Sequence, residues 1–367
     1  MRAEASFGAA VDLNLSAEQT ILVESARELL GRRSPLAAVR ALEAAGRGFD
    51  RELWREVARL GWVGLTLPSE GGHFDLLDVA LLADEMGRAL FPSPFVPTVA
   101  MGAWLIDAFG DEEQRRRWLP RLATGELAVT VALAEPGARS LWDPPGLAIA
   151  GGRLSGRKLF VPFAAEADLV LVAVAGPAVV AVEREASGLV CTRHDALGGE
   201  PLYALAFESV SCEPVAAHPT ALPRALDRGA VATLAYLAGA CERVLEMSVA
   251  HARMREQFGR PIGSFQAIAH RCVDMRSDVD ALRVLVHQAA WCLAAGEAAD
   301  VAVASALAYG LEAVRRILRH AHQVHGAIGF SMEYDLQLFT RRMKAAELGW
   351  GPAALYHECV ARAMGLG

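Results

Sequence analysis

The sequence predicts a mainly α-helical protein in which a small β domain separates two helical domains. Two observations predict this architecture. Apolar residues recur every three or four positions up to about residue 126 and again from about residue 216, whereas they alternate in between. Hydrophobic residues make up 53% of the 367 residues, which excludes a disordered chain. We expect an N-terminal helical domain over 1–126, a central small β-barrel or sandwich domain over 127–215 and a C-terminal four-helix bundle over 216–367.

Helix start and stop signals define the first region. Ser16 and Gln19 have capping-box spacing ahead of the apolar-periodic segment ILVESARELL. The segment RELWREVARLG predicts a second helix that ends at Gly61, where a glycine suits a helix C-cap. The same period predicts further helices over 76–90, 99–109 and 111–125. We expect the segment 1–14 to form a loose arm.

Five short segments rich in β-forming residues predict the strands of the central region, over 128–134, 156–161, 168–174, 178–183 and 203–208. Short strands at such spacing favour a small barrel or sandwich over a parallel sheet. The longest apolar run, 169–182, contains Gly176-Pro177 in its middle. A membrane-spanning helix needs about 20 apolar residues, more than this run provides, so we expect two buried strands and a turn there, and no membrane span.

The C-terminal region predicts four long helices, over 225–255, 264–295, 299–325 and 336–364. Their alanine-rich apolar faces allow the close packing of a four-helix bundle.

Charge and cysteine spacing exclude several classes of function. The formal net charge of −7 argues against binding to nucleic acid, which requires a basic surface. The six cysteines lie far apart in the sequence without a CxxC motif, which indicates thiols in a reducing cytoplasm. The first residues lack the apolar core of a signal peptide. His320, His322 and His325 have no acid or cysteine at a useful spacing, so we expect no metal site.

The segment REQFGRPIGSFQ, from Arg255 to Gln266, is the best candidate for a binding site. We expect one helix to end at Arg255, a tight turn through Gly259, and a second helix capped by Ser264. Free N–H groups at that helix start, with Arg255 and Gln266 beside them, would bind a pyrophosphate. The alternative is an ordinary capped helix–turn–helix with an exposed arginine.

A second glycine-rich segment, HQVHGAIGF, spans residues 322–330 and either approaches a ligand closely or ends a helix. Together with the order of the domains, the two segments resemble the acyl-CoA dehydrogenase family over nearly the whole chain. REQFGRPIGSFQ matches the family pattern RxxFGxxIxxFQ, and the segment from Gln323 matches QxxGGxGF…E…RR…K. EMGRALFPSP and GRKLFVPFAAEADLVLV resemble the actinobacterial subgroup that acts on steroid-side-chain CoA thioesters, which includes heterotetramers as well as homo-oligomers.

The resemblance implies FAD as the cofactor. In the family, the two segments reach across a dimer to the ADP half of the partner's flavin. The cofactor-binding positions that match this pattern are Arg255, Phe258, Gln266, Gln323 and Gly326. Ala327 stands where the family usually has a second glycine.

The resemblance also implies a catalytic glutamate at one of two positions. There the base removes the α-proton of a thioester while the flavin takes a hydride from the β-carbon. These positions hold Gly229 and Trp350 in this chain. Neither side chain can take a proton, so no catalytic residue is assigned.

The segments that face the flavin ring in the family also depart from the pattern. The family's EPxxGSD turn reads EPGARSL, from Glu135 to Leu141. The family's Trp-x-Thr strand reads Phe160-Val161-Pro162, and proline has neither an N–H group nor a hydroxyl to donate to the flavin.

These departures favour a subunit of a heteromeric acyl-CoA dehydrogenase, which lends its ADP clamp to a paralogous catalytic partner that binds the acyl-CoA. One alternative is an active homo-oligomeric dehydrogenase that uses another acid, such as Glu242, Glu246 or Glu347. Others are a regulatory or scaffold protein without flavin and a flavin monooxygenase of the same fold.

Overall fold

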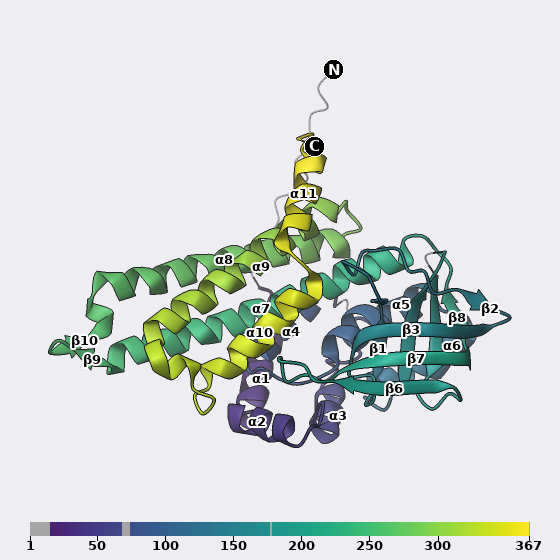
Figure 1. The fold of residues 1–367 in the computed structure, drawn as a ribbon, viewed down its shortest axis with the longest axis horizontal. Coiled ribbons are helices and arrows are strands. Elements are labelled where there is room, and N and C mark those ends of the chain that lie inside the picture. The colour runs from purple at the N-terminus through teal and green to yellow at the C-terminus, as the bar shows by residue number, and fades with distance from the viewer. Residues whose placement is uncertain (1–14, 68–73, 177, 367) are drawn as a thin grey trace.

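The computed structural model describes residues 15–67, 74–176 and 178–366. Figure 1 shows long helices on the left of the view, a β domain on the right and the first helices beneath the middle. The order of a helical region, a β region and a second helical region, predicted from the sequence, is confirmed. The arm expected over the segment 1–14 lies outside the described residues.

The N-terminal helices begin and end at the predicted signals. Ser16 Oγ accepts a hydrogen bond from Gln19 N, and Ser16 N donates to Gln19 Oε1, which completes the capping box. Gly61, with φ +83°, follows the helix that was expected to end there. These helices are α1 (Ala17–Arg33), α2 (Leu36–Ala44), α3 (Arg51–Arg59), α4 (Leu76–Arg88), α5 (Trp104–Phe109) and α6 (Glu112–Ala123).

The chain before α5 differs from the single helix predicted over 99–109. It forms a π-helix, η1 (Val96–Ala103), which continues directly into α5. Thr98 Oγ1 donates to Val129 O and accepts from Val129 N, so η1 is fixed on strand β1 (Val129–Ala132). A Cβ added to Gly102 would lie 2.7 Å from Val129 Cγ1, so this glycine permits the close contact. The π-helix η1 thus allows the chain before α5 to pack closely against β1.

The central region forms two four-stranded sheets that share an apolar core, as a sandwich does. One sheet has the strand order β1–β4–β5–β8 and the other β2–β3–β7–β6. β1 and β4 run parallel, whereas the other pairings among the described strands are antiparallel. The predicted strands correspond to β1, β3 (Arg153–Pro162), β4 (Leu169–Val174), β5 (Ala178–Glu183) and β7 (Leu202–Ser211). The strands that were not predicted are short or largely exposed, namely β2 (Ile149–Ala150), β6 (Leu189–His194) and β8 (Glu213–Ala216).

Strand β4 is buried on both faces, which explains its uninterrupted apolar sequence. Val170 and Val172 pack with side chains of the second sheet, whereas Leu169 and Leu171 join the core beneath the helices. β4 and β5 pair as the antiparallel strands predicted for the apolar run 169–182. None of the described helices is both long and apolar enough to cross a membrane.

The C-terminal helices are α7 (Ala221–Met254), α8 (Gln266–Ala294), α9 (Asp300–His325), α10 (Leu336–Trp350) and α11 (Ala353–Ala363). The prediction of one helix over 336–364 is wrong, because Gly351 turns at φ +87° and Pro352 has no N–H group with which to continue it. The predicted cap at Ser264 is also wrong. Its hydroxyl donates to Pro261 O, and Phe265 takes the N-cap position of α8.

Two glycines let α4 and α7 cross with their backbones in contact. A Cβ added to Gly87 would lie 1.7 Å from Tyr236 O, and one added to Gly239 would lie 1.7 Å from Asp84 O. Because no side chain fits at such distances, both positions require glycine.

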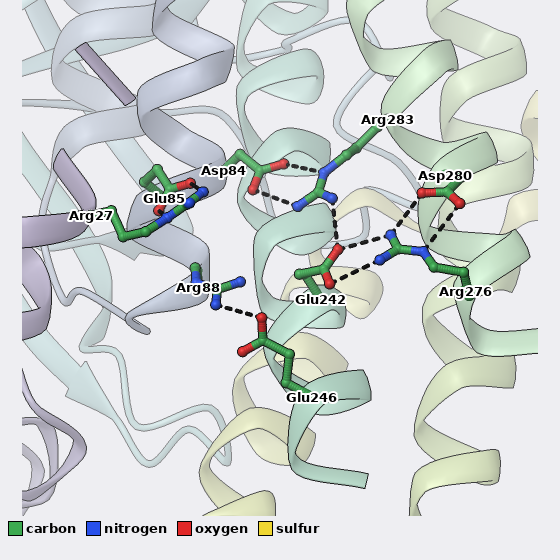
Figure 2. A network of polar contacts seen from close by, with 9 residues as sticks. All are labelled: Arg27, Asp84, Glu85, Arg88, Glu242, Glu246, Arg276, Asp280 and Arg283. Atoms are coloured by element: carbon green, nitrogen blue, oxygen red, sulfur yellow. Dashed lines mark hydrogen bonds and ion pairs between the residues drawn. The ribbon is translucent and has the colours of Figure 1, made fainter. Parts of the chain in front are cut away.

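Ion pairs surround this crossing, as Figure 2 shows. Arg283 on α8 donates to both carboxylate oxygens of Asp84, at 2.8 and 3.0 Å, and to Glu242 at 2.7 Å. Arg27 on α1 binds both oxygens of Glu85, at 2.6 and 3.1 Å. Asp84 and Glu85 are buried, and a buried charge without a partner would be costly. The pairs therefore fix α1, α4, α7 and α8 relative to one another.

Gly239→Ala should destabilise the protein, because the new methyl group overlaps Asp84 O. Overpacking of this kind costs about 1–3 kcal/mol, and more where a backbone must move. Urea unfolding measures the effect. Gly31→Ala is the matched control, since Gly31 is exposed on α1 with nothing within 4 Å of an added Cβ. There alanine should stabilise by roughly 0.5–1 kcal/mol, and equal effects at the two positions would contradict the close crossing.

Candidate functional site

The segment after α7 forms a hairpin at one end of the helical bundle (Figure 1). β9 (Glu256–Gln257) pairs with β10 (Arg260–Pro261). Phe258 and Gly259, at φ +54° and +77°, form the turn between them. Positive φ at both central residues is typical of a type I′ hairpin, which favours glycine at the second position. Phe258 is 93% exposed, so the turn presents an aromatic ring to its surroundings.

The two glycine-rich segments meet at this end of the bundle. α9 ends at His325, whose ring stacks on His251 of α7 with centroids 4.7 Å apart. Gly326 follows at φ +63° and begins the short helix η3 (Gly326–Phe330). Arg255 lies about one helical turn beyond His251. Arg255 and Gln323 therefore lie at neighbouring helix ends.

Three of the predicted cofactor-binding side chains are available to a ligand. Arg255, Gln266 and Gln323 are exposed, and their side chains make no hydrogen bond or ion pair with the described residues. Beside them α8 begins with the N–H groups of Gln266 and Ala267, which no described backbone carbonyl accepts. A guanidinium, two amides and a free helix start have the donor chemistry that a pyrophosphate requires. We call Arg255, Gln266 and Gln323 the clamp residues, and they fit the ADP half of a flavin dinucleotide.

Exposed apolar side chains gather at the same end of the bundle. Met254, Phe258 and Phe330 are 77%, 93% and 71% exposed, and Ile328 and Met332 are exposed as well. We call these five residues the apolar rim. Exposed apolar patches are typical of surfaces that another molecule covers.

The histidines near the hairpin pack as neutral rings. His325 Nδ1 donates to Ala321 O, while His322 stacks on Phe330 and hydrogen-bonds Thr340 through Nε2. Burial lowers the pKa of His322 and of His325 below the usual imidazole value. Within the part of the chain that the structure describes, no group of three or more His, Cys, Asp or Glu side chains could hold a metal ion.

The two positions implied for a catalytic glutamate are both buried, and Trp350 also lines a cavity. Gly229 is buried in α7, where an added Cβ would lie 2.7 Å from Met101 Sδ. Trp350 is 7% exposed at the end of α10, and its carbonyl accepts a hydrogen bond from the Tyr356 hydroxyl. Neither position offers a base, and the space beside Gly229 is already filled.

The three alternative acids are held in ion pairs. Glu242 pairs with arginines of α8 and Glu246 with an arginine of α4, as Figure 2 shows. Burial acts to raise the pKa of Glu242, but Arg276 and Arg283 outweigh it and hold this pKa below its usual value. Glu347 is 3% exposed and pairs with an arginine and a lysine. None of the three lines the cavity beside the β domain.

That cavity, of about 570 Å³, lies between the β domain, α7 and α10. Among the described residues, the carboxylates that line it are Glu135 and Glu200. Nothing in the sequence singles out Glu200, because it lies in the loop between β6 and β7 outside any motif. Its position beside the cavity depends on the packing of distant segments.

The segment expected to face a flavin ring is paired within its own chain. Glu135 accepts hydrogen bonds from Lys158 Nζ at 2.7 Å and from two backbone N–H groups. Phe160, at φ +54°, is 59% exposed. Pro162 has no N–H group, and its carbonyl accepts from Thr130. These residues therefore do not fit the ring half of a flavin.

Comparison with known proteins identifies the family of this chain. Residues 16–126 match the acyl-CoA dehydrogenase N-terminal domain, and residues 220–365 match the C-terminal domain. The chain is 32% identical to the acyl-CoA dehydrogenase IpdE2 of Mycobacterium tuberculosis, over 89% of this chain and 90% of that protein. The chain belongs to the acyl-CoA dehydrogenase family.

Solved structures of acyl-CoA dehydrogenases show the same fold. A variant of the Tcur3481–Tcur3483 steroid ACAD (acyl-CoA dehydrogenase) has a TM-score of 0.88 and 30% identity, covering 95% of this chain and 98% of that chain. The ChsE4–ChsE5 complex from Mycobacterium tuberculosis has a TM-score of 0.88 and 27% identity, covering 97% and 100%. The resemblance found in the sequence is thus confirmed, and the family is one of flavin-dependent oxidoreductases.

Glu135→Gln should make the β domain less stable at neutral pH and less sensitive to acid. Burial acts to raise the pKa of Glu135, but Lys158 and two N–H groups outweigh it, so the folded pKa lies below the ordinary value of 4.5. The stabilisation is therefore present above about pH 4.5 and is lost as the pH falls below that value. The variant should lose about 1–3 kcal/mol at pH 7, because the Lys158 ammonium is fully buried.

Urea unfolding at pH 7 and pH 4 measures this prediction. Glu183→Gln, an exposed acid at the end of β5, is the control and should behave like the wild type. The same loss of stability on acidification in Glu135→Gln and in the wild type would contradict the pairing.

Proposed function

We propose that this chain is a subunit of a heteromeric, FAD-dependent acyl-CoA dehydrogenase, which introduces an α,β double bond into a CoA thioester. In a heterotetramer with two copies of each subunit, it holds the ADP half of a FAD whose ring lies on a paralogous catalytic subunit. When bound, FAD supplies the hydride acceptor. The observation that carries the proposal is an asymmetry: the clamp residues are free, whereas the ring-side residues are paired within the chain or replaced.

Distance supports a clamp that acts on another subunit. Gly229 and Arg255 are 26 positions apart along α7 and its C-cap. At roughly 1.5 Å per residue, this separation is about 39 Å. Figure 1 shows the hairpin at the far end of the bundle from the β domain. Clamp residues this far from the position implied for the catalytic base suit a flavin whose ring is held by another chain.

A protein partner accounts for the apolar rim, because binding would remove these side chains from water. The related structures named Tcur3481–Tcur3483 and ChsE4–ChsE5 each combine two different chains. From this similarity we propose that the chain has a paralogous partner. We also propose that this partner binds the substrate, a steroid-side-chain CoA thioester. The six cysteines are unpaired, which favours a reducing cytoplasm as the compartment.

At the two family positions, the chain has no base for the α-proton of the thioester. Gly229 and Trp350 occupy the positions where the family has glutamate. The other acids considered are held by arginines or a lysine, namely Glu242, Glu246 and Glu347. In this proposal the partner's glutamate removes the proton.

One observation favours a second candidate, an active homo-oligomer whose base lies outside the family positions. Glu200 lines the cavity, and its nearest cation is Arg342 at 3.9 Å. Burial raises the pKa of Glu200, and a raised pKa suits a general base. A regulatory or scaffold protein without flavin, by contrast, does not explain why the clamp residues are exposed and unpaired among the described residues.

Arg255→Ala should weaken flavin retention by the assembled complex roughly 10–150-fold, because a charge-assisted contact contributes about 1.5–3 kcal/mol. Dialysis followed by flavin absorbance measures retention. Arg253→Ala is the matched control, since Arg253 is an exposed arginine near the same helix end without a partner among the described residues. A flavin-replete Arg255→Ala complex would make Arg255 an ordinary surface residue and would contradict the clamp.

Glu200→Gln should leave turnover of the complex within a few-fold, whereas loss of a positioned base typically costs about 10²–10⁴-fold. Replacing the partner's catalytic glutamate should abolish turnover. Trp350→Glu should not create activity in this chain alone, because Pro162 still offers no donor to a flavin. If Glu200→Gln abolishes turnover while flavin content and assembly stay intact, the homo-oligomeric enzyme becomes the better account.

A further inference from the structure

A pair of stacked histidines lies between the two helix ends that carry Arg255 and Gln323. His251 belongs to the last turn of α7, and its carbonyl accepts a hydrogen bond from Arg255 N at 2.9 Å. His325 is the last residue of α9, two positions beyond Gln323. The two rings stack with their centroids 4.7 Å apart and an angle of 27° between their planes. A change in the charge of either ring would therefore act directly beside the clamp residues.

The two histidines differ in how easily they take up a proton. His325 is 5% exposed, and its Nδ1 donates to Ala321 O, so Nε2 carries no proton in the neutral ring. This Nε2 is buried without a hydrogen-bond partner among the described residues. His251 is only half-buried, and neither of its ring nitrogens makes a hydrogen bond to the described residues. A charge on His325 would be buried and unpaired, so His251 is the ring that gains a proton at the lower cost.

Burial and nearby positive charge keep both rings neutral in the chain itself. Burial and the Arg255 guanidinium lower the pKa of His251. Burial also lowers the pKa of His325, and positive charge on His251 or His322 would lower it further, although the Ala321 carbonyl acts in the opposite direction. No carboxylate contributes to either shift.

The other segments around the pair supply no counter-ion either. From the segment before α10, the ring of Tyr334 lies 5.3 Å from that of His325, and burial raises the pKa of this tyrosine, so it is uncharged at neutral pH. The short helix η2 (Ile262–Ser264), which packs against α7, contains no charged residue. Arg253 and Glu256, near the end of α7, are exposed and act on neither histidine. A protonated pair would thus need an anion from outside the described residues.

A bound pyrophosphate would supply that anion. α7 and α9 both end at this place, and the carbonyl end of a helix favours a cation by about 0.3–1 kcal/mol. The pyrophosphate of a dinucleotide carries two negative charges. Held by Arg255, it would offset the repulsion between the guanidinium and an imidazolium, and it would raise the pKa of His251. The anion that binds Arg255 therefore also favours a proton on His251.

We propose that His251 takes up a proton from solvent when a pyrophosphate binds beside Arg255, and that the resulting imidazolium is a second cation of the clamp. The proton adds to a ring nitrogen of His251, no other bond changes, and His325 stays neutral. The inference rests on the proposed function, because it requires a pyrophosphate at Arg255. It adds a dependence of flavin binding on pH, which Arg255 alone does not provide because an arginine keeps its charge throughout the neutral range.

Isothermal titration of FAD into the flavin-free complex at pH 6 and pH 8 tests this inference. No group of FAD changes its charge between these pH values, so a difference in affinity comes from the protein. The wild-type complex should bind FAD about 2- to 10-fold more tightly at pH 6, because a shift of one pKa unit corresponds to a factor of about 10. Titrations at pH 6 in two buffers with different ionisation enthalpies should show a net uptake of protons on binding.

Two variants of His251 identify the group that takes up the proton. His251→Phe keeps a ring that stacks on His325 but cannot be protonated. It should bind FAD like the wild type at pH 8, lose the tighter binding at pH 6 and show no proton uptake. His251→Gln should do the same without an aromatic ring, which separates charge from stacking. His357→Phe is the control and should keep the wild-type pH dependence, because His357 is exposed on α11 beside Glu312.

Equal FAD affinity of the wild type at the two pH values, or unchanged pH dependence in both His251 variants, would overturn the inference. Equal weakening at pH 6 and pH 8 in both variants would overturn it as well, because that result indicates a purely structural role. Arg255→Ala separates this inference from the proposed function. If Arg255→Ala weakens FAD binding but the wild type shows no pH dependence, the clamp stands and only the role of His251 is wrong. Unchanged FAD binding in Arg255→Ala would contradict the clamp itself.

Discussion

The contact between α4 and α7 at Gly87 and Gly239 is the constraint on which the rest of the structure depends. Because the two backbones touch, Asp84 on one helix and Glu242 on the other come within reach of a single arginine, Arg283. Their charges are paired and partly buried together, which fixes α7 on α4 and α8. α7 is 34 residues long, with the cavity along its middle and the hairpin at its end. The placement of this one helix therefore determines where both regions lie.

Contacts within the chain distinguish the ring-side residues of the cofactor site from the clamp residues. Lys158 is fully buried, and an ammonium in such a place needs a carboxylate, which Glu135 provides at 2.7 Å. The same bond that stabilises the β domain ties the ring-side turn to its own strand. At the C-terminal end of α7, by contrast, no described side chain forms a hydrogen bond or ion pair with Arg255. The chain thus keeps the donors suited to a pyrophosphate while its ring-side groups serve its own fold.

Features with local causes could be predicted from the sequence, and features that depend on distant neighbours could not. The capping box at Ser16 involves residues three apart and is confirmed. Ser264 has the same residue type, but Pro261 O takes its hydroxyl, and spacing rules do not anticipate that competition. Gly351 is a typical helix-end residue, but the apolar period continues beyond it. The prediction of one helix over 336–364 relied on that period and missed the break. Glu200 becomes a cavity residue only through its approach to α10, so no local pattern marks it. The roles of the clamp residues stay predictions.

The number of flavins bound per complex tests the central claim most directly. Native mass spectrometry of this chain, purified alone and together with its paralogous partner, measures that number. A heterotetramer with two copies of each subunit should bind two FAD molecules, because only the partner holds flavin rings, and the chain alone should bind none. Four FAD molecules per heterotetramer, or a flavin-bound homo-oligomer of this chain alone, would contradict the account.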